Sequence, residues 1–292
     1  ASRWAGGGGR GSGGFGQGGG GGKGGKKQDS AVLSAIVWLR NHQSPDGHWD
    51  ADGFSEMCKL NVCDGPGHSV HDIGVTGLAL LCFLGAGYTH ADESQFRNTV
   101  KNGLKYLIEQ QDEDGCFGPR SGQQLLYGHA CAALAMAEAY GMTTAKPFKE
   151  PAQKGIYFIQ RAQNPYRAWR YSYPPDGDND SSVTGWMVMA LKSGILSKLD
   201  VDGAAITNAM SWIDEMTDVN TGRTGYNTPG GYPARVTARM ALFPAEKSES
   251  MTAVGVLCRI FAGRTLTDDP MIAKGADLML RLPPTWIRDT GD

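Results

Sequence analysis

The sequence has 292 residues, of which 40% are hydrophobic, and carries a formal net charge of -2. This length suits one large domain or two small ones, and the near-neutral charge gives no electrostatic footprint for nucleic acid. Because no run approaches the roughly 18 consecutive apolar residues of a membrane-spanning helix, we expect no membrane span within the chain.

The first 30 residues are dominated by glycine and contain almost nothing that could form a core. Such a tract behaves as a flexible coil. We therefore predict a disordered linker over residues 1–30 and one globular domain over residues 31–292. The sequence leaves the compartment open, and a membrane tether upstream of the linker is one alternative.

The globular part begins with a unit that recurs along the chain. Residues 38–49 read aromatic, aliphatic, three residues, glutamine, five residues, aromatic, and residues 106–117 and 158–169 repeat this spacing. A fourth unit has Thr217 in the glutamine position and a longer loop to Tyr226, and a fifth stops with the chain. Repetition at this period indicates an array of supersecondary units.

Cys58 and Cys63 lie in a polar loop after the first unit. Two unpaired thiols, a local disulfide and half of a metal site are the alternatives. A C-x4-C pair without a second pair is a poor zinc signature, which favours the first two.

A second helix follows each unit and ends in glycine, as helix C-termini often do. These runs are apolar nearly throughout, which predicts buried helices, whereas the first helix of each unit is amphipathic. Two helices per repeat predict an all-α fold, an α/α barrel or solenoid. The apolar runs are residues 75–87, 128–141, 183–194 and 251–263.

The repeated unit resembles the QW motif of squalene and oxidosqualene cyclases. Residues 38–49 match its second half, and residues 102–117 match with Asn102 for the basic residue and Phe117 for tryptophan. Residues 154–169 match its start, with Arg167 in place of glycine. From about residue 31 onward the chain is similar to the prenyltransferase and squalene-cyclase repeat superfamily, in particular to bacterial prenyltransferase/squalene-oxidase-repeat proteins of unassigned activity.

That resemblance implies an α/α toroid of helix-pair repeats, left incomplete here because the chain stops in its fifth pair. It also implies that the repeated glutamines and aromatics are structural and tie neighbouring outer helices together. An amide there can satisfy backbone N–H groups at a neighbouring helix start. The residues concerned are Gln43, Trp49, Gln111, Phe117, Gln163 and Trp169.

The segments that lead into the apolar helices are where a site would form, at one rim of the barrel. Class II terpene cyclases carry D-x-D-D there, where a protonated carboxyl protonates an alkene; such an acid needs neighbouring charge and low dielectric. Asp176, Asp178 and Asp180 resemble this motif but lack its last aspartate. Because Asp72 recurs at the position of Asp180, both also fit helix N-caps. The other predicted rim or cavity residues are His71, Asp72, His129, Trp169, Tyr171 and Trp186.

The resemblance also raises the possibility of a zinc site. Protein prenyltransferases bind zinc through a D-x-C motif and a distant histidine, and neither Asp72 nor Asp180, at the start of an apolar helix, begins a D-x-C. His68, His71 and His129 are weak metal candidates, and histidine as a hydrogen-bonded polar group or helix cap is the favoured interpretation. We therefore predict no metal and no cofactor.

Two functions remain. The favoured one is a non-catalytic binding or scaffold domain with an apolar cavity or aromatic rim, for an isoprenoid, lipid or polysaccharide ligand. The alternative is an isoprenoid-handling enzyme, similar to squalene or terpene cyclases, with Asp178 or Asp180 as general acid. A zinc-dependent prenyltransferase ranks behind both.

Overall fold

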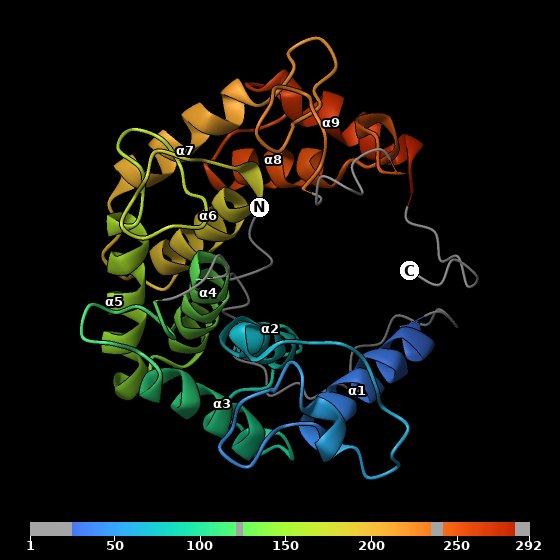
Figure 1. Ribbon diagram of the computed structural model, residues 1–292, viewed down its shortest axis with the longest axis vertical. Helices are drawn as coiled ribbons and strands as arrows, with labels where there is room; N and C mark the ends of the chain where they lie inside the picture. The colour runs from blue at the N-terminus through green and yellow to red at the C-terminus, as the bar shows by residue number, and fades with distance from the viewer. Residues whose placement is uncertain (1–24, 121–124, 235–241, 284–292) are drawn as a thin grey trace. The chain divides into compact units, whose positions relative to one another are not determined.

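The computed structural model describes residues 25–120, 125–234 and 242–283, and these residues form helices without a β-strand (Figure 1). The predicted all-α class is therefore confirmed, and the alternation of amphipathic and apolar helices is that of an α/α toroid. The predicted linker falls largely outside the described residues, and the first helix begins at Gly25.

The odd-numbered helices are the first helices of the repeated units. They are α1 (Gly25–Asn41), α3 (Arg97–Glu109), α5 (Lys146–Arg161), α7 (Gly203–Glu215) and α9 (Pro270–Arg281). The even-numbered helices are the apolar runs, namely α2 (Asp72–Gly85), α4 (Leu125–Thr143), α6 (Ser181–Leu196) and α8 (Ser250–Phe261). Among the described residues, three short 3-10 helices lie between them, η1 (Phe54–Met57), η2 (Ser69–His71) and η4 (Ala245–Lys247).

The chain divides into two compact units, each with its own packing. The first contains the described residues up to Ala162, residues 171–173 and residues 190–201. The second contains residues 163–170 and 174–189, and the described residues from Asp202 onward. Helix α6 contributes its first half to the second unit and its second half to the first.

In the first unit, α2 packs on α4, and α4 packs on α5. Small residues let α2 and α4 approach closely: a Cβ added at Gly77 would lie 2.6 Å from the carbonyl carbon of Cys131. Helix α4 is apolar on all sides and almost wholly buried, as expected for a helix surrounded by protein. In the second unit, α8 packs against both α7 and α9.

Candidate functional site

The three repeated glutamines each make the same pair of hydrogen bonds. The Gln111 amide nitrogen donates to the carbonyl of Gly115 in its own loop (3.1 Å) and to that of Pro151 in α5 (3.0 Å). We expected the amide to satisfy backbone N–H groups; instead it donates to backbone carbonyls, and so ties each loop to the following odd-numbered helix. The equivalent acceptors are Gly47 and Thr99 for Gln43, and Arg167 and Ala205 for Gln163.

The residue in each aromatic position also makes a repeated bond, this time to the next even-numbered helix. The backbone N–H of Trp49 donates to Thr76 Oγ1 at 3.0 Å, and that of Trp169 donates to Thr184 Oγ1 at 3.4 Å. In the fourth repeat the residue in this position is Thr224, not Tyr226. Its N–H donates to Thr252 Oγ1 at 3.3 Å.

His129 takes the place of that threonine in α4. Its Nδ1 accepts the backbone N–H of Phe117 at 3.1 Å, and its Nε2 lies 3.1 Å from the carbonyl of Gly155, to which it must donate. The ring is therefore neutral with both nitrogens engaged, and complete burial lowers the pKa of His129 to about 4. No lone pair remains for a metal ion in this arrangement.

Asp180, the sharpest catalytic candidate, is fully buried at the start of α6. Its Oδ1 accepts the backbone N–H of Val183 at 2.8 Å, which is the N-cap bond, and its Oδ2 accepts the Tyr226 hydroxyl at 3.1 Å. The Nε of Arg170 lies 3.8 Å from Oδ2. Burial outweighs these interactions and raises the pKa of Asp180 to about 6.

Asp176 and Asp178 lie in the loop that precedes Asp180, and both are exposed. The Asp176 carboxylate accepts the backbone N–H of Asp178 at 2.9 Å. Asp178 pairs with Arg170 at 3.1 Å while its side chain stays 68% exposed. The three aspartates are thus close in sequence, but only Asp180 is in a low-dielectric environment.

His68, His71 and Asp72 lie in the first unit, at η2 and the start of α2. The rings of His68 and His71 are 6.4 Å apart, and His68 Nδ1 accepts the N–H of Val70. The predicted N-cap role of Asp72 is wrong, because α2 begins at Asp72 itself and His71 is at the cap position. Asp72 instead accepts the N–H of Ala51 at 2.9 Å, so it holds the preceding loop, and burial raises its pKa.

The predicted rim aromatics differ in exposure. Trp169 is fully buried, whereas Tyr171 and Trp186 are half-buried. The ring of Tyr171 lies 6.0 Å from that of Tyr127. Of the three, only Tyr171 and Trp186 present surface that a ligand could contact.

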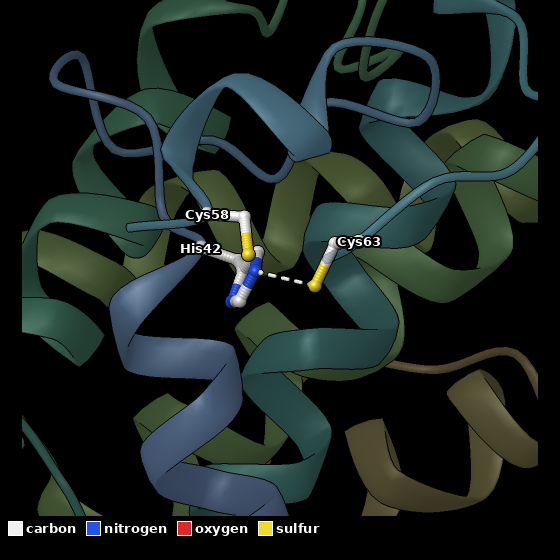
Figure 2. A group of neighbouring side chains, drawn as sticks. All are labelled: His42, Cys58 and Cys63. Atoms are coloured by element: carbon white, nitrogen blue, oxygen red, sulfur yellow. Dashed lines mark hydrogen bonds between the residues drawn. The ribbon is translucent and has the colours of Figure 1, made fainter. Parts of the chain in front are cut away.

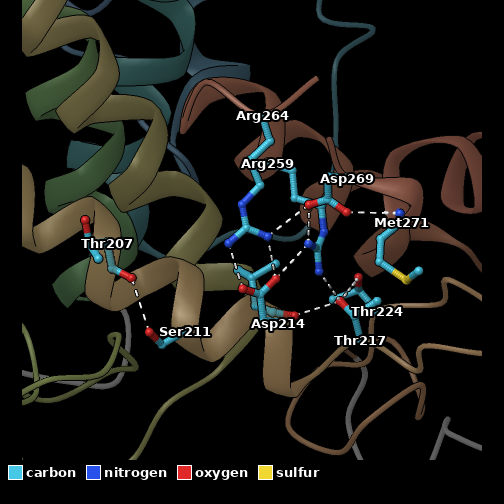
Figure 3. Close-up of polar contacts among 10 residues, drawn as sticks. Thr207, Ser211, Asp214, Thr217, Thr224, Arg259, Arg264, Asp269 and Met271 are labelled. Atoms are coloured by element: carbon cyan, nitrogen blue, oxygen red, sulfur yellow. Dashed lines mark hydrogen bonds and ion pairs between the residues drawn. The ribbon is translucent and has the colours of Figure 1, made fainter. Parts of the chain in front are cut away.

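A hollow of about 480 Å³ lies in the second unit, and charged side chains line much of it. Arg259, 3% exposed, pairs with Asp269 at 2.6 Å and with Asp214 at 2.7 Å, and Arg264 pairs with the same two carboxylates (Figure 3). Arg259 also donates to Thr217, the residue in the glutamine position of this repeat. Because these charges neutralise one another, the network stabilises the repeat rather than offering a free charge.

A cluster that sequence reasoning did not assemble lies in the first unit. His42, directly after α1, meets Cys58 and Cys63 from the polar loop, and their donor atoms all lie within 4.8 Å of one another (Figure 2). The Cys58 and Cys63 thiols are free. The sequence shows a histidine beside Gln43, but nothing in it says that the loop folds back onto this helix end.

Comparison with known proteins finds a distant similarity to an enzyme. The chain is 24% identical over 221 residues to a squalene–hopene cyclase of Zymomonas mobilis, and the match covers 70% of this chain and 32% of that enzyme. No family model matches the chain. The similarity supports a terpenoid-cyclase-like fold, and the chain spans about a third of the relative's length. None of the helices that the structure describes is long and apolar enough to cross a membrane.

Proposed function

We propose that this chain is a non-catalytic binding or scaffold domain built on a terpenoid-cyclase-like helical fold. The observation that supports the proposal best is the bonding of Asp180. A general acid must present its proton to the substrate, yet one oxygen of Asp180 caps α6 and the other accepts a hydroxyl from Tyr226. The carboxyl therefore serves the fold at the position where a cyclase would need an acid.

The neighbouring carboxylates do not replace it. Asp178 is largely exposed and paired with Arg170, so it lies outside the low-dielectric surroundings in which such an acid would have to work. His129 is likewise occupied on both nitrogens. The predicted ligand classes, isoprenoid, lipid or polysaccharide, are retained for this domain.

One observation favours the alternative, an isoprenoid-handling enzyme. Burial raises the pKa of Asp180 to about 6, so a fraction of the carboxyl is protonated near neutral pH. Such a proton could reach an alkene only if the Tyr226 hydroxyl moved away from Oδ2.

The two functions are separated by incubating the purified chain with squalene and analysing the extracted hydrocarbon by gas chromatography and mass spectrometry. A squalene–hopene cyclase is the positive control, and Asp180→Asn and Asp178→Asn are the matched variants. We expect unchanged squalene from all three forms of this chain. A cyclised product from the wild-type chain that disappears in Asp180→Asn, with the fold intact by circular dichroism, would establish the enzyme instead.

A further inference from the structure

The cluster of His42, Cys58 and Cys63 joins the end of α1 to the loop that follows η1. His42 lies at the C-terminal end of α1, Cys58 directly follows η1, and Cys63 lies further along the same loop. His42 is 4% exposed and Cys58 6% exposed, while Cys63 is half-buried. His42 and Cys58 are therefore screened from water, and Cys63 is partly open to it.

Hydrogen bonding orients the imidazole toward the sulfurs. His42 Nδ1 lies 2.7 Å from the carbonyl oxygen of Trp38. A carbonyl can only accept, so Nδ1 carries the proton and Nε2 carries the lone pair of the neutral ring. Nε2 faces Cys63 Sγ at 3.3 Å (Figure 2), and the indole of Trp38 stacks on the imidazole with ring centroids 3.9 Å apart. An N–H bonded to a backbone carbonyl is how metal-ligating histidines are usually held.

The loop that carries Cys58 and Cys63 turns back on itself between the two cysteines. The chain can turn back in this way because Asn61 adopts a left-handed conformation (φ 49°), which asparagine tolerates, and its N–H donates to the Cys58 carbonyl at 3.1 Å. With this turn in place, both sulfur atoms lie close enough together to bind one ion.

The spacing suits one small tetrahedral ion. With Zn–S of about 2.3 Å and Zn–N of about 2.0 Å, tetrahedral donors lie about 3.5–3.8 Å apart. The three donor atoms lie within 4.8 Å of one another, so binding needs shifts of about 1 Å or less. Two thiolates with an imidazole form a soft donor set that favours zinc over magnesium or calcium.

We propose that His42 Nε2, Cys58 Sγ and Cys63 Sγ bind a zinc ion, with a water molecule in the fourth position. No further His, Cys, Asp or Glu of the described residues joins this group. Binding releases the two thiol protons to solvent and fastens the loop of residues 58–63 to the end of α1. This site is independent of Asp180 and of the proposed function.

The test uses the full chain, reduced with a phosphine and stripped with a chelator. Zinc is added in competition with a chromophoric chelator, and cobalt is used as the spectroscopic probe. We expect one zinc per chain, and a sulfur-to-cobalt charge-transfer band with the intense visible bands of a tetrahedral ion. Cys63→Ser should weaken zinc binding about 100-fold or more, Cys58→Ser/Cys63→Ser should abolish it, and Cys82→Ser, which removes an exposed thiol elsewhere, should leave it unchanged.

Thiol alkylation of the wild-type chain supplies a readout that does not depend on variants folding. Zinc should slow alkylation of Cys58 and Cys63 and leave that of Cys82 unaffected. The proposal is overturned if the reduced wild-type chain binds no zinc or if Cys58→Ser/Cys63→Ser binds zinc as tightly as the wild type. Formation of a Cys58–Cys63 disulfide in the presence of equimolar zinc would also overturn it.

Discussion

Replacing Asp180 by asparagine should make the chain's stability less dependent on pH. Asparagine caps a helix about as well as aspartate, so the bond to the Val183 N–H is retained. What the variant removes is the cost of ionising a buried carboxyl. Because the folded pKa of about 6 lies above the ordinary 3.8, the folded state favours the protonated acid. The stability that the folded protein gains from this preference is fully present below pH 3.8 and is lost as the pH rises through 6.

The size of the effect follows from the two pKa values. A difference of about 2 pKa units corresponds to about 3 kcal/mol over the full window. Between pH 4.5 and pH 7 the wild type should therefore lose about 2 kcal/mol that Asp180→Asn does not lose. The variant should equal or exceed the wild type in stability at neutral pH, provided that its amide accepts the Val183 bond.

Urea unfolding at several pH values, followed by tryptophan fluorescence, measures the difference between the two proteins directly. Asp178→Asn is the matched control, because it makes the same substitution at a carboxylate that is 68% exposed. Asp180→Ala should cost about 1 kcal/mol more than the asparagine variant because it lacks the cap. If the difference between wild type and Asp180→Asn is the same at pH 4.5 and pH 7, the carboxyl is not desolvated and this reasoning fails.

Three further predictions concern the packing of the repeats. Gln111→Ala should cost about 1–3 kcal/mol of unfolding free energy, since two carbonyls lose their donor, whereas exposed Gln110→Ala should cost less than about 0.5 kcal/mol in the same urea titration. His129 has a folded pKa of about 4, below its ordinary 6.5, so its contribution to the unfolding free energy is full above pH 6.5 and is lost as the pH falls toward 4. Between pH 7 and pH 5, His129→Asn should therefore lose about 2 kcal/mol less unfolding free energy than the wild type, and equal losses would refute this. Arg259→Leu should cost about 3 kcal/mol or more because it leaves buried partners behind; half-buried Arg264→Ala should cost less in thermal unfolding, and the reverse order would contradict the network.

The helices were predictable because each repeat shows two different hydrophobic patterns. The apolar run at residues 75–87 coincides closely with α2, and the amphipathic segment at residues 100–111 with α3. Helix propensity and the hydrophobic pattern are local properties of each segment, so the sequence alone predicts these helices. The sequence does not show that Thr224 takes the aromatic position of the fourth repeat, because the loop after Thr217 is one residue longer than in the other repeats. The bond from the Thr224 N–H to Thr252 identifies it.

The candidate sites were harder to predict from the sequence, for a different reason. The N-cap interpretation of Asp180 could be read from its place before an apolar helix, but its bond to Tyr226 joins residues 46 apart. The contacts of His42 are equally hard to predict. Cys58 and Cys63 lie near His42 because of how their loop folds, and no sequence pattern predicts that fold. Tertiary contacts across loops are decided by the whole fold, and a single sequence gives no direct signal for them.

The most direct test of the proposed function is proton transfer to an alkene. The chain is incubated with squalene in deuterated buffer, and the recovered hydrocarbon is examined for deuterium by mass spectrometry. If Asp180 serves the fold, the squalene is recovered without deuterium, in the same state as from Asp180→Asn. Deuterium incorporated by the wild type and absent with Asp180→Asn would show that this carboxyl delivers a proton, and the domain would then be an enzyme.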